Sequence, residues 1–274
     1  MQNAGLAALD LPWRYLAFDV PPEELATAIG GAKAMRFIGL NLTVPHKLLA
    51  VPLVDVLDES ARNWAAVNTI RFEGRAKDGI WRPLNVCPEA TTIRSHGFNT
   101  DADALVRSLR EDLGLELANR KVLVLGAGGA GRTAALKLAS EGVAELFLVN
   151  RTVAKAEAVE REIAGRFPPV KTVVGFPSGQ VDLLLNATAL GLKPEDELPI
   201  DEQVFPLRRA SAVYDMIYRP AETRLLKAAR VAGCRVANGL GMLLYQGAKA
   251  LEIWTAQPAP VAVMRAALEK NIYG

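Results

Sequence analysis

The stretch 121-KVLVLGAGGAGR-132 decides the fold, because a short apolar run ends there in closely spaced glycines. A continuous apolar run of this length is typical of a strand that is buried on both faces of a sheet. Gly126 permits a tight turn, Gly128 lets the backbone approach a pyrophosphate, and Gly131 lets the following helix lie close to the sheet. The strand–turn–helix context therefore predicts a dinucleotide-binding loop, with a purely packing role for the glycines as the alternative.

Strand-like and helical patterns alternate on either side of this loop. The predicted strands are 121–127, 145–150, 170–175, 181–188 and 211–218, and the predicted helices are 131–142 and 152–167. Repeated alternation of this kind indicates a parallel sheet that is covered on both faces. Two more predicted helices, 240–256 and 260–271, carry apolar faces that need a partner.

The first hundred residues alternate less regularly. We expect strands at 13–20, 36–44 and 65–72, a helix at 22–33 and a further helix at 102–113. The stretch 73–97 contains Pro83 and Pro88 and little periodicity, so we interpret it as a loop or a hairpin.

The strand after the glycine loop ends in Asn150-Arg151-Thr152, without an acidic residue. Proteins that bind NAD usually place Asp or Glu at this point, where its carboxylate holds the ribose 2′-hydroxyl. A carboxylate would repel the 2′-phosphate of NADP, whereas an arginine can pair with that phosphate and stack on the adenine. The sequence favours NADP over NAD, and the alternative for Arg151 is a solvated charge after a strand.

The stretch 41-NLTVPHK-47 ends an apolar run in a hydroxyl, a proline and a lysine. Pro45 lacks an N–H and cannot continue a central ladder, so we expect His46 and Lys47 to begin a helix. The helix macrodipole opposes a lysine at that position, which indicates a site, although surface lysines are common. Thr43 would face the same crevice, or its hydroxyl would bond locally.

Two other polar positions follow or interrupt apolar runs. Asn68 lies within 65-AAVNTIRF-72, and because a buried amide needs partners it is either structural or binds a ligand. Asn99-Thr100-Asp101 opens the helix 102–113, where Asp or Thr would cap the N-terminus. The residues alone leave the structural and the functional explanation open at both positions.

Composition excludes several classes of protein. The chain has 274 residues, 50% of them hydrophobic, and a net charge of +2, so charge predicts neither nucleic-acid nor membrane binding. Cys87 and Cys234 lie far apart and the chain has only 2 histidines, so we expect no metal site and a reducing cytoplasm. No apolar run reaches the ~18 residues of a membrane span, and the N-terminus does not read as a signal peptide.

In order along the chain, these motifs resemble those of the shikimate dehydrogenases, the NADP-linked enzymes of aromatic amino-acid biosynthesis. The resemblance covers nearly the whole chain. The motifs that carry it are NLTVPHK (41–47), AVNT (66–69), NTD (99–101), GAGGAGR (126–132), NRT (150–152), NATALGL (186–192), YDMIYRPAET (214–223) and NGLGMLLYQGAKALEIWT (238–255).

The resemblance implies a role for each matching residue. Lys47 and Asp101 would be the catalytic pair. The substrate would be bound by Thr43, Asn68, Tyr218 and Gln246. NADP would be bound by Gly126, Ala127, Gly128, Gly129, Ala130, Gly131, Asn150, Arg151 and Thr152, and its nicotinamide pocket would be lined by Thr188, Met216, Gly239 and Met242.

The resemblance also implies an α/β fold with two domains. Residues 1–101 and 240–274 would form the α/β substrate domain, and 102–239 a Rossmann-type NADP-binding domain with a parallel sheet. The implied activity is reversible, NADP-dependent reduction of 3-dehydroshikimate to shikimate by a cytoplasmic monomer or homodimer. The alternatives are a quinate/shikimate dehydrogenase paralogue and a catalytically inactive nucleotide-binding scaffold or sensor.

The sequence departs from the family pattern at its start. The family begins with a strand and a Ser-x-Ser motif that binds the substrate carboxylate, whereas 1-MQNAGLAAL-9 resembles a later point, with Gln2 where His is usual. The sequence is therefore either a truncated reading of a longer protein or a divergent relative. Loss of an internal strand would expose neighbouring strand edges, so we expect pairing with another chain or a rearrangement.

Overall fold

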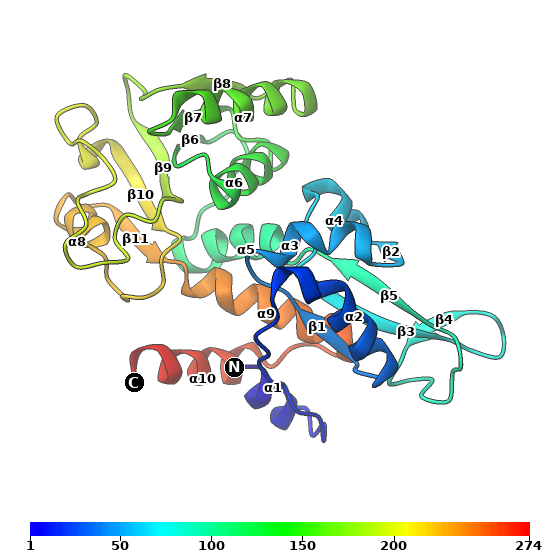
Figure 1. Ribbon diagram of the computed structural model, residues 1–274. Helices are drawn as coiled ribbons and strands as arrows, with labels where there is room; N and C mark the ends of the chain where they lie inside the picture. Colours follow the sequence, from blue (N-terminus) through cyan, green and yellow to red (C-terminus); the bar gives the residue numbers. More distant parts are fainter. The chain divides into compact units, whose positions relative to one another are not determined.

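A computed structural model describes residues 1–274 of the chain. The chain forms two compact units (Figure 1). Unit 1 comprises Met1–Asp101, Leu244–Ile272 and Gly274, and unit 2 comprises Ala102–Leu243 and Tyr273. The chain passes between the units at the first residue of helix α5 (Asp101–Leu113) and within helix α9 (Leu240–Thr255). The predicted α/β fold with two domains is confirmed.

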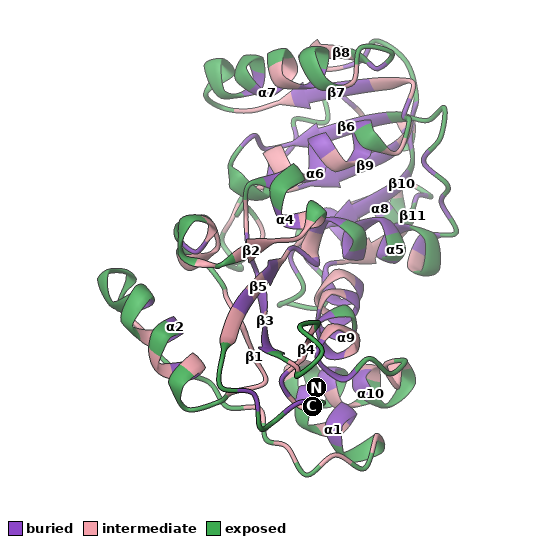
Figure 2. Cartoon of the chain, turned by 90° about the vertical axis from the view of Figure 1, so that its right-hand side faces the viewer, coloured by how far each residue is buried: buried purple, intermediate pink, exposed green.

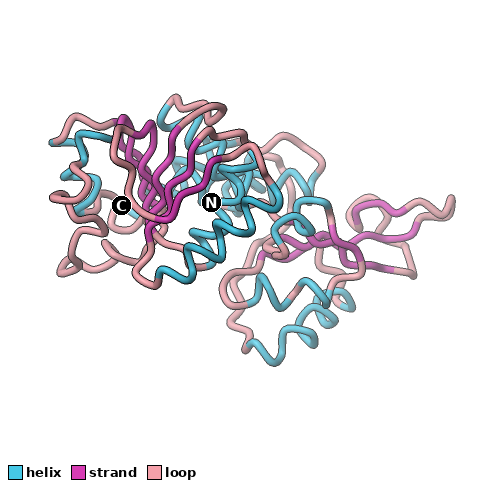
Figure 3. Tube along the Cα trace, turned by 90° about the horizontal axis from the view of Figure 1, so that it is seen from above, coloured by secondary structure: helices cyan, strands magenta, loops and turns pink.

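Unit 2 is built on a six-stranded sheet with the strand order β11-β10-β9-β6-β7-β8. Its strands are β6 (Lys121–Leu125), β7 (Glu145–Val149), β8 (Lys171–Val174), β9 (Val181–Asn186), β10 (Ala210–Asp215) and β11 (Arg235–Asn238). Every neighbouring pair is parallel, and Figure 3 shows strands running side by side between helices. The chain goes outward from β6 to β8 and then returns to β9 on the other side of β6. That reversal is the point at which open parallel sheets bind ligands.

The helices of unit 2 cover the two faces of this sheet. They are α5, α6 (Gly129–Ser140), α7 (Val153–Arg166) and α8 (Arg224–Val231), with a short 3-10 helix at Leu207–Arg209. Leu225 and Leu226 of α8 pack in one core cluster with Val213 of β10. The next residue, Tyr214, bonds Ser108 of α5, and because successive strand residues face opposite sides, α5 and α8 lie on opposite faces. The four inner strands, β6, β7, β9 and β10, are accordingly buried along most of their length, whereas the edge strands β8 and β11 are exposed or half-buried (Figure 2).

Unit 1 is built on a mixed five-stranded sheet. Its strands are β1 (Gly39–Asn41), β2 (Val56–Leu57), β3 (Thr69–Arg75), β4 (Trp81–Pro83) and β5 (Ile93–Phe98). The order is β1-β3-β5-β2, with β4 paired to β3, and only β2 and β5 run parallel. The helices are α1 (Gln2–Ala8), α2 (Leu25–Ala34), α3 (His46–Leu49), α4 (Glu59–Trp64), part of α9, and α10 (Val261–Tyr273), with 3-10 helices at Pro22–Glu24 and Val51–Leu53. Ile70 and Phe72 of β3 pack against Ile29 of α2 in the core.

Three sequence predictions for unit 1 need correction. The strand predicted at 13–20 is wrong, because this segment has no regular secondary structure. The backbone N–H and C=O of Tyr15 instead bond the side chain of Asn3. The strand β1 ends sooner than the predicted strand 36–44, and β3 begins at Thr69 rather than at 65. Ala65 holds a left-handed backbone with φ of 50° at the end of α4, which no strand residue adopts.

The stretch 73–97 was predicted to form a loop or a hairpin, and it contains a hairpin. Strand β3 continues to Arg75, turns through a bond from the N–H of Ala76 to the carbonyl of Ile80, and returns as β4. In unit 2, the sequence analysis missed α8 and β11, which lie between residues 218 and 240. No helix of the chain combines the length and the apolar character required to cross a membrane.

Candidate active site

The ammonium of Lys47 and the carboxylate of Asp101 form an ion pair in unit 1. Lys47 Nζ lies 2.8 Å from Asp101 Oδ2, and the side chains are 28% and 15% exposed. This partial shielding distinguishes the pair from a fully solvated one, in which water would cancel most of the attraction. An acid–base pair that solvent still reaches can exchange a proton with a bound molecule.

Local structure explains why these two residues meet. Lys47 is the second residue of α3, whose start after Pro45 was predicted, and its carbonyl accepts a bond of 2.8 Å from the N–H of Val67. Asp101 is the first residue of α5, and its N–H donates to Asn99 Oδ1 at 3.0 Å. The side chain of Asn99 therefore satisfies the N–H of the first helical residue.

Asn68 ties the segments around the pair together. It is 1% exposed, its Nδ2 donates to Thr100 Oγ1 at 2.9 Å, and its Oδ1 accepts from the N–H of Thr100 at 2.9 Å. The Thr100 hydroxyl also donates to the carbonyl of Gln246 in α9 at 3.0 Å. The amide oxygen of Asn68 and one hydrogen of its Nδ2 are thus used by the protein, and substrate binding by Asn68 stays a prediction.

The other three residues predicted to bind the substrate lie in different surroundings. Thr43 is exposed, and its carbonyl accepts from the N–H of His46. Gln246 is half-buried on α9 in unit 1. Tyr218 belongs to unit 2, where its side chain is 39% exposed and its carbonyl accepts from Tyr273 Oη at 2.8 Å. Substrate binding by these residues stays a prediction.

The glycine loop of unit 2 has the geometry that a pyrophosphate requires. Gly126 has φ of 101°, a conformation that favours glycine, and a Cβ on Gly131 would lie 2.1 Å from the carbonyl oxygen of Gly126. A Cβ on Gly128 would meet no protein atom within 4 Å, so the space beside it is open to a ligand. The first helical bond of α6 is made by the N–H of Arg132 to Gly128, which leaves the earlier N–H groups of the helix to bind an anion.

Asn150 holds the glycine loop against the end of β7. Its Oδ1 accepts from the N–H of Ala127 at 2.9 Å, and its Nδ2 donates to the carbonyl of Thr152 at 2.8 Å. The N–H of Ala127 is therefore occupied within the protein, and Asn150 shapes the loop. Arg151 and Thr152 are exposed beside it, at the end of β7 and the start of α7.

The residues predicted to line the nicotinamide pocket lie at the carboxyl ends of β9, β10 and β11. A Cβ on Gly126 would lie 3.1 Å from Thr188 Cγ2, and a Cβ on Gly239 would lie 2.1 Å from the Met216 carbonyl oxygen. Met242 lies in the first turn of α9, the helix that begins directly after Gly239. The loops that carry these residues therefore meet at one edge of the sheet.

Three family models match parts of the chain. The Shikimate dehydrogenase substrate binding domain matches residues 1–70, Shikimate / quinate 5-dehydrogenase matches 108–188, and the Shikimate 5'-dehydrogenase C-terminal domain matches 239–269. A curated relative, the shikimate dehydrogenase (NADP(+)) of Methanopyrus kandleri, is 38% identical over 99% of this chain and 90% of its own. The chain belongs to the shikimate dehydrogenase family.

Solved structures agree with membership of the shikimate dehydrogenase family. A shikimate dehydrogenase crystallised with NADP+ is 35% identical and covers 100% of this chain and 90% of its own, with a TM-score of 0.83. The ligand-free 5-ketofructose reductase of Gluconobacter sp. strain CHM43 is 34% identical and covers 98% of this chain and 91% of its own, with a TM-score of 0.80. The same fold therefore carries more than one named activity.

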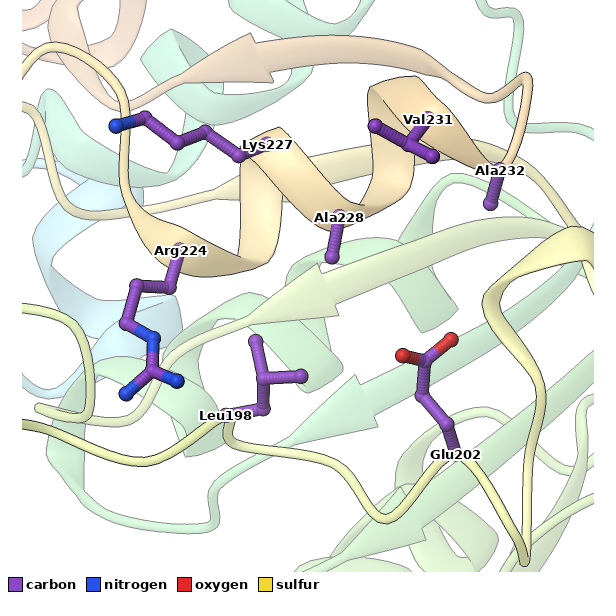
Figure 4. Close-up of a pocket in the computed structure, with 7 residues that line it drawn as sticks. All are labelled: Leu198, Glu202, Arg224, Lys227, Ala228, Val231 and Ala232. Atoms are coloured by element: carbon purple, nitrogen blue, oxygen red, sulfur yellow. The ribbon is translucent and has the colours of Figure 1, made fainter.

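A hollow on the surface of unit 2 lies apart from these shikimate dehydrogenase motifs. It is formed by α8 and the segment between β9 and β10, and its lining residues are Leu198, Glu202, Arg224, Lys227, Ala228, Val231 and Ala232 (Figure 4). None of the residues predicted for catalysis or binding lines it, and Val231 is 91% exposed. The hollow is a shallow depression beside α8, and it is not the candidate site.

Asp215 was not among the site residues predicted from the sequence. It is fully buried at the end of β10, where its carboxylate accepts bonds from Asn186, Thr223 and the N–H of Ile217. Burial raises the pKa of Asp215 above its ordinary value, although these hydrogen bonds oppose the rise. The available signal was an acid inside the apolar run 211-SAVYDMIY-218, where an unpaired carboxylate is costly.

Proposed function

We propose that the protein catalyses the reversible, NADP-dependent reduction of 3-dehydroshikimate to shikimate. The observation that carries the proposal is the contact of 2.8 Å between Lys47 Nζ and Asp101 Oδ2, in a chain that belongs to the shikimate dehydrogenase family. Substrate would bind to unit 1 beside this pair, and the cofactor would bind to the glycine loop of unit 2. The proposal includes a cytoplasmic location and a monomer or homodimer.

Lys47 and Asp101 provide the proton chemistry of this reaction. The ammonium of Lys47 lies where it can stabilise negative charge on the substrate oxygen and donate a proton to it as the carbonyl becomes an alcohol. The Asp101 carboxylate, 2.8 Å away, orients the ammonium and can accept a bond from a ring hydroxyl. Because the two charges interact, their protonation states belong to the pair and not to either residue alone.

The surroundings of the glycine loop fit NADP. Bound NADPH would supply the hydride that the carbonyl carbon accepts. The open space beside Gly128 and the first N–H groups of α6 would hold the pyrophosphate. Arg151 would pair with the 2′-phosphate, because the end of β7 carries no carboxylate to repel it.

The decisive experiment measures rates with shikimate and with quinate, each against NADP and NAD. We expect the highest kcat/KM for shikimate with NADP. A preference for quinate would instead indicate a quinate/shikimate dehydrogenase paralogue. The family model that matches residues 108–188, Shikimate / quinate 5-dehydrogenase, names both substrates. Absence of turnover with every combination would contradict the proposed activity.

A second candidate follows from the likeness to 5-ketofructose reductase. Both substrates are polyhydroxylated ketones, so one acid–base pair beside a hydride donor serves either reaction. The same assay with 5-ketofructose and NADPH separates the two candidates, since a hydroxyl-binding site discriminates strongly between differently placed hydroxyls.

The remaining alternative is an inactive nucleotide-binding scaffold. Tryptophan fluorescence, titrated with NADPH and then with shikimate, tests it directly. Binding of cofactor without any response to shikimate, together with no turnover, would favour the scaffold. The presence of both Lys47 and Asp101, in contact with each other, argues against it.

A further inference from the structure

We propose that Asp215 is a positioning residue that holds the loops after β9 and β10 in the form that receives the nicotinamide end of NADP. The inference rests on the proposed function, because it concerns the same cofactor site. Asp215 acts through Asn186 and Thr223 and does not itself reach the surface, since it is fully buried.

The carboxylate fixes the orientation of the Asn186 amide. Asn186 Nδ2 donates to Asp215 Oδ1 at 3.0 Å, while Asn186 Oδ1 accepts from the N–H of Thr188 at 3.1 Å and from its hydroxyl at 2.8 Å. A carboxylate only accepts, so the amide must turn its NH₂ toward Asp215 and its oxygen toward Thr188. Asn186 Nδ2 also donates to the carbonyl of Leu190 at 3.4 Å, so the carboxylate of Asp215 is the nearer of two acceptors that hold the amide in this orientation.

This orientation also determines which hydrogen bonds the Thr188 hydroxyl donates and which it accepts. Its single hydrogen is donated to Asn186, and it accepts from the N–H of Leu190 at 3.2 Å, so one lone pair remains for a ligand. The loop after β9 is thereby prepared for a ligand that donates a hydrogen bond. The carboxamide NH₂ of nicotinamide is such a donor.

The other carboxylate oxygen secures the loop after β10. The hydroxyl of Thr223 donates to Asp215 Oδ2 at 2.6 Å, and the same oxygen of Thr223 caps α8 by accepting from the N–H of Leu226 at 3.3 Å. The N–H of Ile217 donates to Asp215 Oδ1 at 3.1 Å. One carboxylate thus ties both ends of the segment from Met216 to Thr223 to the end of the sheet.

The strand order assigns this region to the nicotinamide half. The glycine loop follows β6 and Arg151 follows β7, so the adenosine half lies on that side of the reversal between β6 and β9. A dinucleotide spans the reversal, so its other half meets the carboxyl ends of β9 and β10. Asp215 and Asn186 are the last residues of those two strands and are paired in register.

The test compares two ligands of the whole protein. NADP carries both halves, and adenosine 2′,5′-bisphosphate carries only the adenosine half. For Asp215→Ala we expect the Kd of NADP to rise about tenfold, because a buried amide and hydroxyl lose their acceptor, while the Kd of the bisphosphate stays within about twofold. Asp215→Asn keeps one carbonyl oxygen for Asn186 and Ile217, so it should restore most of the NADP affinity.

Controls keep the result independent of folding. Thr223→Val removes one bond and preserves shape, so it tests the same idea if Asp215→Ala fails to fold, with a rise of about threefold in the Kd of NADP. Asp182→Ala removes a carboxylate that accepts from Lys121 N–H and from Arg120 at the opposite end of the same sheet, and it should change neither Kd.

Two outcomes would overturn the inference. Equal loss of affinity for both ligands would make Asp215 a general support of unit 2, and unchanged affinity for NADP would separate it from the site. The Kd values of NADP and of the bisphosphate depend on binding alone, so they can be interpreted even if the wild-type protein does not oxidise shikimate. Failure of the proposed function is therefore distinguishable from failure of this inference.

Discussion

At the scale of the residue, the lysine of the ion pair is the group whose removal isolates the chemical step. Lys47→Met keeps the length of the side chain and removes its charge and proton. We expect kcat to fall by roughly 10²- to 10⁴-fold, the loss typical of a missing acid–base group, with the KM for NADP nearly unchanged. Steady-state rates with shikimate and NADP measure this.

A matched control exists within the same unit. Lys33 forms an ion pair of 3.0 Å with Asp55 and is similarly half-exposed, yet it belongs to no predicted site. Lys33→Met should leave kcat within about twofold, as expected for a surface ion pair. An equal loss of activity in both variants would show that Lys47 acts on stability and not on proton transfer.

We expect cofactor choice to depend on the single side chain of Arg151. Arg151→Ser removes the exposed guanidinium beside the start of α7, so the KM for NADPH should rise about tenfold while that for NADH changes little. Arg161→Ser, also exposed but within α7, serves as the control for loss of a positive charge. An unchanged ratio of the two KM values would make Arg151 a solvated charge.

The sequence could single out Lys47 and Arg151 because each residue is unusual at its position in the motif. A proline followed by a lysine at a helix start, and an arginine where an acid is usual, conflict with ordinary local preferences. Asn99 and Asp215 could not be assigned in this way. Their partners, Asp101 and Asn186, are set by backbone geometry and strand register, and neither is visible in spacing.

At the scale of the element, the approach of α6 to β6 depends on one glycine. A Cβ on Gly131 would lie 2.1 Å from the backbone oxygen of Gly126, so Gly131→Ala must move the helix. We expect a loss of about 1–3 kcal/mol in the free energy of unfolding, measured by urea denaturation. Gly129→Ala is the control, because its Cβ would meet nothing within 4 Å and stability should not fall. Equal losses would contradict the close approach.

The sheet of unit 1 contains a buried carboxylate with several cationic partners. Glu73 on β3 is 2% exposed and contacts Arg71, Arg94 and His96. Burial alone would raise the pKa of Glu73, but hydrogen bonds from His96, Arg71 and Arg94 outweigh it and lower the pKa from 4.5 to about 2. Because the folded-state pKa is depressed, the stabilisation is complete above pH 4.5 and is lost as the pH falls toward 2.

This pKa gives a measurable pH dependence. The loss between pH 4.5 and about 2 should be on the order of 3 kcal/mol in the free energy of unfolding. Glu73→Gln should be less stable at pH 7, because the arginines lose their counter-charge, and its stability should decline less as the pH falls. Urea denaturation of both proteins between pH 7 and 3 compares the slopes. Identical slopes would assign the acid sensitivity to other carboxylates.

Elements were predictable where a buried parallel sheet imposes its own pattern. Strands β6, β7 and β9 are apolar at most positions because both faces are covered, so the sequence marks them clearly. The segment 13–20 has the composition of a strand, but strand formation also needs a neighbour with free backbone groups. The outer edge of β1 has such groups, but the segment 13–20 does not pair with it, and the backbone of Tyr15 bonds the side chain of Asn3 instead, so composition alone gave the wrong answer.

At the scale of the whole molecule, the division into two units predicts where each ligand acts. Unit 1 holds both ends of the chain and the Lys47–Asp101 pair, and unit 2 holds the glycine loop. A ligand that binds only the folded form stabilises it by about 2.7 kcal/mol at a concentration of 100 Kd. Local opening of the binding segments should be suppressed first, because ligand-binding loops are generally among the least stable parts of a protein.

Hydrogen exchange can therefore map the two sites separately. NADP should slow exchange most strongly at 126–131 and 150–152, and shikimate should slow it most strongly at 43–47 and 99–101. The Arg151→Ser variant should lose the NADP effect at 150–152 while retaining it at the glycine loop, since the pyrophosphate contacts are backbone N–H groups. Protection of 43–47 by NADP alone, with no change at 126–131, would contradict the assignment of the cofactor to unit 2, because the loop geometry at Gly126 and Gly131 would then serve packing only.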